Sequence, residues 1–251
     1  MSRNFILFFV IALVFLVGCT KGVSQVIEEE KLKSDEIPKL EEIADEVIDM
    51  AKNIQWLGHD SFKISGEKII YTDPYKIKKE DKADIILITH PHYDHCSPDD
   101  VRKIQGEDTI IVTTPDCASK LSGDIKTVMP GDSIEAKGIK IEAVPAYNIN
   151  KQFHPKANKW VGFIFTANSK RIYLAGDTDK IPEMANLNDV DIALLPVSGT
   201  YVMTAEEAAE ATNLIKPKLA VPMHYGAGVV GTKADAEKFK ELCSCNVEIL
   251  G

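Results

Sequence analysis

Short segments in which apolar and polar positions alternate begin at residue 54 and predict β-strands joined by tight turns. Residues 54–65 and 68–74 predict two strands around a turn at Ser65 and Gly66. Two later segments each predict a hairpin that turns at a pair of residues favourable for tight turns: 132–148 at Lys137-Gly138, and 160–179 at Asn168-Ser169.

Other segments are apolar without interruption, which is typical of strands covered on both faces. They are residues 83–90, 108–115, 190–199 and 218–226. Helical patterns alternate with them, at residues 99–104, 204–216 and 233–243, and residues 246–250 predict a last strand. Hairpins early in each half and helix–strand alternation later predict an α/β fold with two sheets packed face to face and helices outside.

The first residues have a different pattern. An uninterrupted apolar run extends from Phe5 to Val17 after a single cation, Arg3, as in the core of a signal peptide. The run ends in the sequence LVGC, which resembles a lipobox, the signal read by lipoprotein-processing enzymes, and implies cleavage before Cys19 and lipidation of its thiol. We therefore expect a signal peptide over residues 1–18 and a protein anchored on the extracytoplasmic face of a membrane. The alternative is an uncleaved signal anchor.

Residues 19–53 are charged and predict a tether with a short amphipathic helix. Its apolar positions recur at helical spacing: Ile37, Leu40, Ile43, Ala44, Val47, Ile48 and Ala51. This helix either acts as a spacer from the membrane or lies against the domain. The remaining residues, 54–251, are long enough for one domain with a substantial core.

The formal net charge of −9 disfavours binding to long nucleic acids, because an acidic surface repels phosphates. Apart from Cys19, the chain has Cys96, Cys117, Cys243 and Cys245. An extracytoplasmic site permits disulfides, but spacing alone assigns no pair, and free buried thiols are an equal alternative. Cys243 and Cys245 are too close in sequence to bridge easily.

Residues able to bind metals end several of the apolar segments. His90, Asp177 and His224 each follow a predicted strand directly, and ligand sites gather at the carboxyl ends of strands covered by helices. Residues 90–95, HPHYDH, contain three of the six histidines in the chain. His90 and His92 are spaced to point to one side of an extended segment, and Asp94 and His95 can turn to a neighbouring point. Imidazole and carboxylate groups suit zinc, manganese or iron.

The sequence HPHYDH matches the HxHxDH motif of the metallo-β-lactamase superfamily, and the chain from about residue 54 onward resembles its lactonase-like branch. The resemblance implies a four-layer αβ/βα sandwich with two divalent metal ions, most simply Zn²⁺, with Mn²⁺ or Fe²⁺ as alternatives. It implies His90 and His92 as ligands of the first ion. It implies Asp94, His95 and His224 as ligands of the second, with Asp177 bridging.

The family's third histidine for the first ion has no direct counterpart, because that place is occupied by Tyr147 and Asn148. Either His154, six residues after Asn148, loops back to complete the site, or Asn148 serves as a weak ligand. We expect His154.

Two residues near the predicted metal ligands, His59 and Asp73, each have two interpretations. His59 is either a proton donor or substrate contact near the ions, or a turn cap. Asp73 either accepts a hydrogen bond from a ligand histidine or caps a turn. The remaining expectations are structural: Thr178 and Asp179 as loop caps, Thr204 with Glu207 as a capping box, Trp56 and Trp160 as core aromatics, and Tyr201 free to face a substrate.

These features predict a metal-dependent hydrolase in which a water shared by two ions attacks an ester, lactone or related bond in a small molecule. In this reading Asp177 and Asp94 position the ions, and His59 or Asp94 handles the proton of the leaving group. A phosphodiesterase acting on a lipid headgroup is the alternative enzyme. A non-catalytic metal-binding lipoprotein and a protein that captures metal for a transporter are the alternatives outside enzymology.

Overall fold

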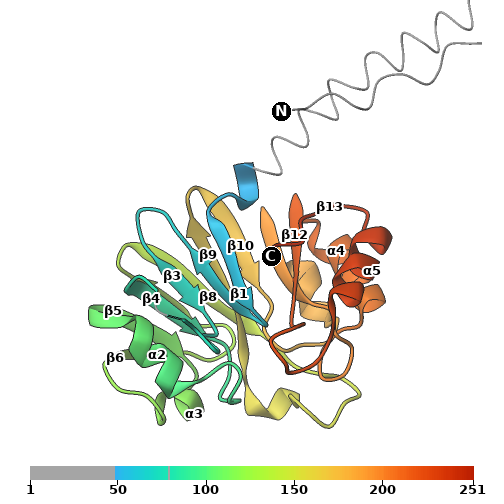
Figure 1. Cartoon of the computed structure of the whole chain (residues 1–251). Coiled ribbons are helices and arrows are strands. Elements are labelled where there is room, and N and C mark those ends of the chain that lie inside the picture. Colours follow the sequence, from blue (N-terminus) through green and yellow to red (C-terminus); the bar gives the residue numbers. More distant parts are fainter. Residues whose placement is uncertain (1–48, 79) are drawn as a thin grey trace, which may run out of the picture. The chain divides into compact units, whose positions relative to one another are not determined.

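Two β-sheets form the centre of the domain. The computed structural model describes residues 49–78 and 80–251. The first sheet has the order β1-β2-β3-β4-β5-β6, and the second has the order β13-β12-β11-β10-β9-β8-β7 (Figure 1). The first sheet comprises β1 (Ile54–Gly58), β2 (Ser61–Ile64), β3 (Ile70–Thr72), β4 (Ala83–Ile88), β5 (Gln105–Thr113) and β6 (Asp124–Thr127). The second comprises β7 (Ser133–Ala136), β8 (Ile139–Pro145), β9 (Val161–Ala167), β10 (Lys170–Leu174), β11 (Ile192–Pro196), β12 (Leu219–Met223) and β13 (Asn246–Val247).

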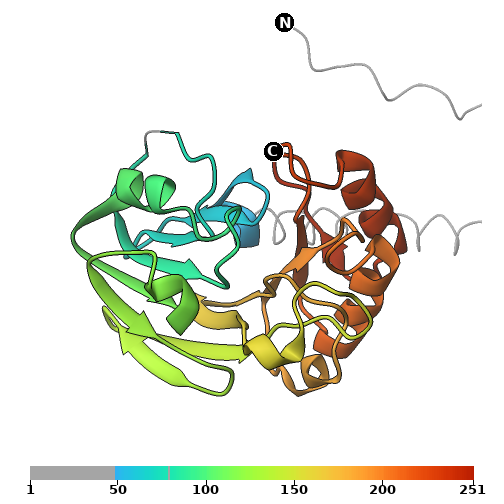
Figure 2. The ribbon, with the colours of Figure 1, turned by 90° about the horizontal axis from the view of Figure 1, so that it is seen from below.

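Helices lie outside the sheets (Figures 1 and 2). Those next to the first sheet are α2 (Pro98–Ile104) and α3 (Pro115–Ala118), and those next to the second are α4 (Ala205–Ile215) and α5 (Lys233–Leu242). Two 3₁₀ turns, η1 (Lys156–Asn158) and η2 (Pro182–Asn186), lie in connecting segments. The predicted αβ/βα sandwich is therefore confirmed.

The apolar runs are continuous because each central strand has two covered faces. In β4, Ile85 and Leu87 join the core between the sheets, whereas Ile86 and Ile88 pack with α2 residues such as Val101. All four isoleucine and leucine side chains are fully buried. Removing each from water contributes about 1.5–3 kcal/mol, which explains why alternation is lost from this strand.

One strand prediction was wrong. Residues 54–65 form two antiparallel strands, β1 and β2, rather than one. The chain reverses at Gly58 and His59, both of which have positive φ, and the Trp56 indole donates a hydrogen bond to the His59 carbonyl. Glycine makes such a reversal inexpensive. The reversal places His59 and Asp60 in a turn at one edge of the sheet.

The hairpin turns at Lys137-Gly138 and Asn168-Ser169 are confirmed by the pairing of β7 with β8 and of β9 with β10. The capping box of α4 is also confirmed, since Thr204 and Glu207 bond each other's backbone amides. Strand β6 was not predicted, because it is short, none of its residues is fully buried, and Ile125 is its single apolar residue.

The predicted signal peptide, Cys19 and nearly all of the tether helix lie outside the described residues. Residues 49–51 are helical, and Met50 and Ala51 are buried in the core. Among the described residues, no helix has the length and apolar character needed to cross a bilayer.

Candidate metal centre

The parallel strands of both sheets bring metal-competent residues to one edge. Strands β3 to β6 run parallel in the first sheet, as do β10 to β13 in the second. His90 follows β4, Asp177 follows β10 and His224 follows β12. Because each residue lies just beyond the carboxyl end of its strand, side chains far apart in sequence meet between the two sheets.

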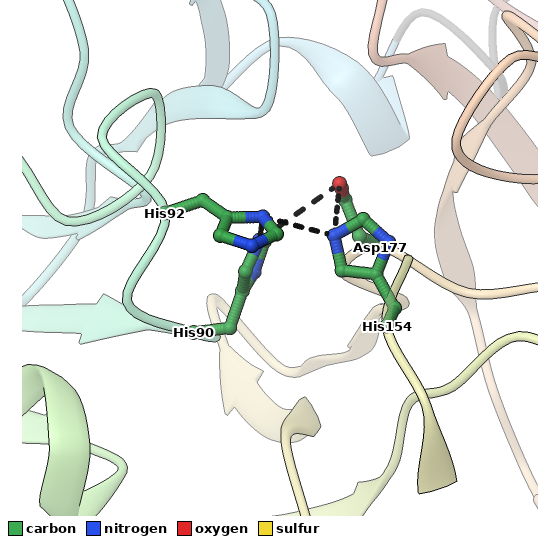
Figure 3. A group of neighbouring side chains, drawn as sticks. All are labelled: His90, His92, His154 and Asp177. Atoms are coloured by element: carbon green, nitrogen blue, oxygen red, sulfur yellow. Dashed lines mark hydrogen bonds and ion pairs between the residues drawn. The ribbon is translucent and has the colours of Figure 1, made fainter. Parts of the chain in front are cut away.

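The first group consists of His90, His92, His154 and Asp177, whose candidate ligand atoms all lie within 4.8 Å of one another (Figure 3). His92 Nδ1 is 3.0 Å from His90 Nε2 and 3.1 Å from His154 Nε2. His154 Nε2 is 3.1 Å from Asp177 Oδ2, and His90 Nε2 is 3.8 Å from the same oxygen. These four atoms point toward a common centre.

Such spacing fits a bound cation. Ligand atoms at about 2.1 Å from a tetrahedral zinc ion are about 3.4 Å apart. Ring nitrogens this close to one another direct their lone pairs at the same point, and these lone pairs repel one another. A cation at that point would attract all of them. The donor set of this group, three imidazoles and a carboxylate, therefore fits the metal that the sequence implied.

His154 reaches the group because its loop folds back on itself. The Asn148 backbone amide donates to the His154 carbonyl at 2.8 Å, and the Asn148 side-chain amide donates to the carbonyls of Phe153 and Tyr201. His154 itself adopts a positive φ of 56°. These bonds hold the loop so that His154 reaches the first group. The Asn148 side-chain nitrogen lies 3.3 Å from His154 Nδ1, whereas His154 Nε2 is the atom that faces the group.

The second group surrounds the other side of Asp177. Ring nitrogens of His59, His95 and His224 lie within 4.8 Å of one another, and so do ligand atoms of Asp60, His95 and Asp177. His95 Nε2 is 3.4 Å from Asp177 Oδ1, and His224 Nε2 is 3.2 Å from Asp177 Oδ2. The Asp177 carboxylate therefore contacts both groups.

Asp94 belongs to the second side of the centre. Its Oδ2 lies 3.2 Å from His59 Nε2 and 4.0 Å from His95 Nε2. His59 is fully buried, so its ring contacts Asp94 and the neighbouring imidazoles rather than the surface. The roles of His59 and of the seven predicted metal ligands stay predictions, but all eight residues lie together at this edge.

Outer hydrogen bonds fix the orientation of several rings. Asp73 Oδ2 lies 2.9 Å from His95 Nδ1, and the Asp73 carboxylate also accepts the Thr89 amide and hydroxyl, each at 2.7 Å. Ser198 Oγ lies 2.8 Å from His224 Nδ1. With their Nδ1 atoms engaged, His95 and His224 direct Nε2 inward, as metal-binding histidines do.

Burial and the charges of neighbouring groups shift the pKa values of the clustered residues. Burial lowers the pKa of His90 well below its usual range, and neighbouring imidazoles lower it further. Burial alone would raise the pKa of Asp177, but His224 and His95 hold it well below its usual range. The Asp177 and Asp73 carboxylates outweigh burial and hold the pKa of His95 well above its usual range. The lowered pKa of Asp177 favours its ionised form, which is the form that binds cations.

Three residues near the centre were not singled out from the sequence as part of it. Asp60 is fully buried beside His95, and Ser198 orients His224. Trp160, expected to be a core aromatic, is buried, but its ring lies 4.9–5.5 Å from the rings of His90, His92 and His154. Asp60 could have been suspected because it follows His59 directly, whereas no sequence signal marks Trp160 or Ser198.

The other neighbours behave as loop elements. The Thr178 hydroxyl bonds the Tyr147 backbone, and Asp179 accepts the Ile149 amide, so both cap loops as expected. Trp56 is partly buried against the core and stacks on Tyr225. Tyr201 packs edge-on against Phe153.

Among the cysteines of the described segment, Cys96 and Cys117 form a disulfide, while Cys243 and Cys245 are free. Cys96 follows His95 directly, so the disulfide fastens the end of the HPHYDH loop to α3. Spacing could not assign this pair, because a sequence separation of 21 gives no indication that the two cysteines are in contact.

Comparison with known proteins agrees with this geometry. A family model described as a beta-lactamase superfamily domain matches residues 53–224. A UPF0173 metal-dependent hydrolase of Thermoplasma acidophilum is 36% identical over 204 residues, which cover 75% of this chain and 89% of that protein. A second one, from Thermococcus onnurineus, is 35% identical over 213 residues, covering 78% and 94%.

Two solved structures share the fold. A candidate metal-dependent hydrolase of Parabacteroides distasonis is 37% identical, with a TM-score of 0.71, and the match covers 78% of this chain and 91% of that one. Igni18, a metallo hydrolase of Ignicoccus hospitalis, is 25% identical with a TM-score of 0.63, covering 78% and 94%. The chain therefore belongs to the metallo-β-lactamase superfamily, among the UPF0173 metal-dependent hydrolases.

Proposed function

We propose that the protein is a binuclear hydrolase that cleaves an ester, lactone or related bond in a small molecule. The observation that carries this proposal is the position of Asp177, whose two oxygens contact histidines of both groups. Two bound cations, Zn²⁺ or alternatively Mn²⁺ or Fe²⁺, would lower the pKa of a shared water toward neutrality and polarise the bond under attack.

The protein's own residues supply position and proton handling. His90, His92 and His154 hold the first ion, and Asp94, His95 and His224 hold the second. Asp94 is the residue best placed to relay the leaving-group proton, because it is slightly exposed and its Oδ2 lies 3.2 Å from His59 Nε2. His59 acts through Asp94 in this proposal, since its ring has no exposed surface.

The rim of the centre favours a substrate with an apolar part. Tyr93, within the HPHYDH loop, is 67% exposed, and Phe153, beside His154, is 47% exposed. Tyr75 packs edge-on against Tyr93 on one side, and Tyr201 packs against Phe153 on the other. Exposed aromatic side chains around a polar centre are typical of sites that bind an apolar group next to the reacting bond.

A phosphodiester in a lipid headgroup is the second candidate substrate, favoured by two rim cations. Lys120 bonds the carbonyl of Pro91, within the HPHYDH loop, and Lys76 bonds the carbonyl of Ala227 beside Tyr75. Both ammonium groups donate to neutral backbone carbonyls in these bonds, and a lysine ammonium has further donors to offer an anionic substrate.

We also propose that the protein is a lipoprotein anchored through Cys19 on the extracytoplasmic face of a membrane. Support comes from the LVGC sequence and from the Cys96–Cys117 disulfide, because disulfides persist mainly in oxidising compartments. Mass spectrometry of membrane-extracted protein tests this proposal: an acylated N-terminal Cys19 is the expected result, and an intact N-terminus contradicts it.

The enzymatic proposal is tested by elemental analysis of the purified protein together with hydrolysis assays on aryl esters, lactones and phosphodiesters. About two ions per chain and turnover that disappears with a chelator are the expected results. Two ions without turnover on any of these bonds would favour the non-catalytic metal-binding lipoprotein, and easily exchanged ions would favour metal capture. Absence of bound metal contradicts all three proposals.

A further inference from the structure

Asp60 is a buried carboxylate without a hydrogen-bond partner. It lies in the turn between β1 and β2, its side chain is fully buried, and neither Oδ1 nor Oδ2 has a hydrogen-bond partner. Burying an ionised carboxylate is strongly unfavourable unless a positive charge or several donors compensate it. The position of Asp60 therefore requires an explanation that the hydrogen bonds of the protein do not supply.

The surroundings of Asp60 point to a cation. Its Oδ2 lies 3.9 Å from His95 Nδ1, and ligand atoms of Asp60, His95 and Asp177 all lie within 4.8 Å of one another. The rings of His59 and His224 complete this side of the centre. Two carboxylates that approach one another repel unless positive charge lies between them, and a metal ion shared by both supplies that charge together with bonds that imidazoles cannot make.

Asp60 is not needed to orient any of the neighbouring histidine rings. The Nδ1 atom of His95 already pairs with Asp73, and the Nδ1 atom of His224 already pairs with Ser198. Asp60 forms no hydrogen bond to His59, the remaining imidazole, whose Nε2 lies 3.2 Å from Asp94 Oδ2 instead. Asp60 thus differs from Asp73, which accepts three hydrogen bonds and has a clear supporting role.

We propose that Asp60 is an additional ligand of the second metal ion. This inference rests on the proposed binuclear centre but not on its substrate. Ligands of the second ion then include three carboxylates, those of Asp60, Asp94 and Asp177, whereas the first ion has one carboxylate and three imidazoles. Oxygen ligands favour harder cations, so the second site prefers Mn²⁺ or Fe²⁺ more strongly than the first site does.

The experiment measures metal affinity and thermal stability of the purified protein and of Asp60→Asn, which keeps the shape and removes the charge. Titration of metal-free protein with Mn²⁺ and with Zn²⁺ is expected to show two binding events in the parent. In the variant, the affinity for the second ion is expected to fall at least about tenfold, more for Mn²⁺ than for Zn²⁺. The thermal midpoint of the metal-free variant is expected to equal or exceed that of the parent, and its gain on metal loading to be smaller.

Asp84→Asn is the matched control, because Asp84 lies at the opposite end of β4 and accepts the Ile69 amide. It is expected to bind both ions as the parent does. Equal affinity for the second ion in Asp60→Asn and in the parent overturns the inference and leaves the binuclear proposal intact. Fewer than two ions in the parent overturns the binuclear proposal itself.

A crystal structure of the loaded parent gives a reading that does not depend on how a variant folds. An Asp60 oxygen at about 2.0–2.2 Å from the second ion is the expected result for zinc. An Asp60 carboxylate outside the coordination shell overturns the inference.

Discussion

The two sides of the metal centre share Asp177 but are built differently. On the first side, His90, His92 and His154 approach Asp177 with ligand atoms 3.0–3.8 Å apart, and His92 is partly exposed. On the second side, His59, Asp60 and His95 are fully buried, and each has side-chain atoms without hydrogen-bond partners.

The difference teaches how each side is prepared for a cation. The first side has four candidate ligands, whose spacing fits one tetrahedral ion. It lies next to the proposed substrate rim at Tyr93 and Phe153. The second side has buried charged and polar atoms that no hydrogen bond satisfies, so we expect its folding to depend more on a bound cation. We therefore expect the second ion to contribute more to stability and the first to be more sensitive to loss of a single histidine.

The largest effect is expected from removing the metals altogether. Saturating ions at a thousand times their dissociation constant contribute about 4 kcal/mol per site, and about 1 kcal/mol shifts the thermal midpoint of a domain of this size by about 2–4 °C. Calorimetry before and after chelation of both ions is expected to show a fall of about 15–30 °C. An unchanged midpoint would contradict the dependence of the buried side on a cation.

Asp177→Asn is expected to have the next largest effect, because it removes the charge that both sides share. Metal content is expected to fall from about two ions per chain to less than one, and hydrolysis to fall by at least about a hundredfold. Elemental analysis with steady-state assays measures both. Retention of two ions in this variant would show that Asp177 does not link the two sides.

His154→Ala tests the first side by itself. Metal content is expected to fall from about two ions to about one, with the second ion retained. Asn148→Asp is the comparison variant, since it changes the residue that fastens the loop without removing the ring. Two ions in His154→Ala would remove His154 from the proposed ligand set and direct attention to Asn148.

Asp73→Asn perturbs the second side more mildly. It weakens the partner of His95 Nδ1 but leaves the ring in place, so the affinity for the second ion is expected to fall about 10–100-fold while the first ion stays bound. Competition with a chelator measures each affinity. Equal weakening of both ions would mean that the two sides do not respond separately.

The smallest effect is expected at a distance from the centre. Thr204→Ala removes the side-chain cap of α4, which costs about 1 kcal/mol and lowers the thermal midpoint by about 2–4 °C. Metal content is expected to stay at the parent's value. A loss of metal in this variant would show that the centre responds to general destabilisation, and the comparison of the two sides would then need a different basis.

Much of the fold was predictable because local pattern and sheet geometry agree. Strand β4 is apolar throughout, since one face contacts the other sheet and the other contacts α2. The hairpins at Lys137-Gly138 and Asn168-Ser169 follow from turn residues between alternating strands. The error at residues 54–65 arose because the short reversal at Gly58 and His59 resembles a continuation of the strand in sequence.

The sequence by itself determined which strands end in metal-competent residues, because His90, Asp177 and His224 directly follow apolar segments. Only the tertiary structure decided that His154 rather than Asn148 points into the first group, that Asp73 supports His95, and that Asp60 lies unpaired on the second side. These contacts join residues up to 62 positions apart. Their formation depends on how two sheets and their loops pack, and no local pattern along the chain encodes a contact of that range.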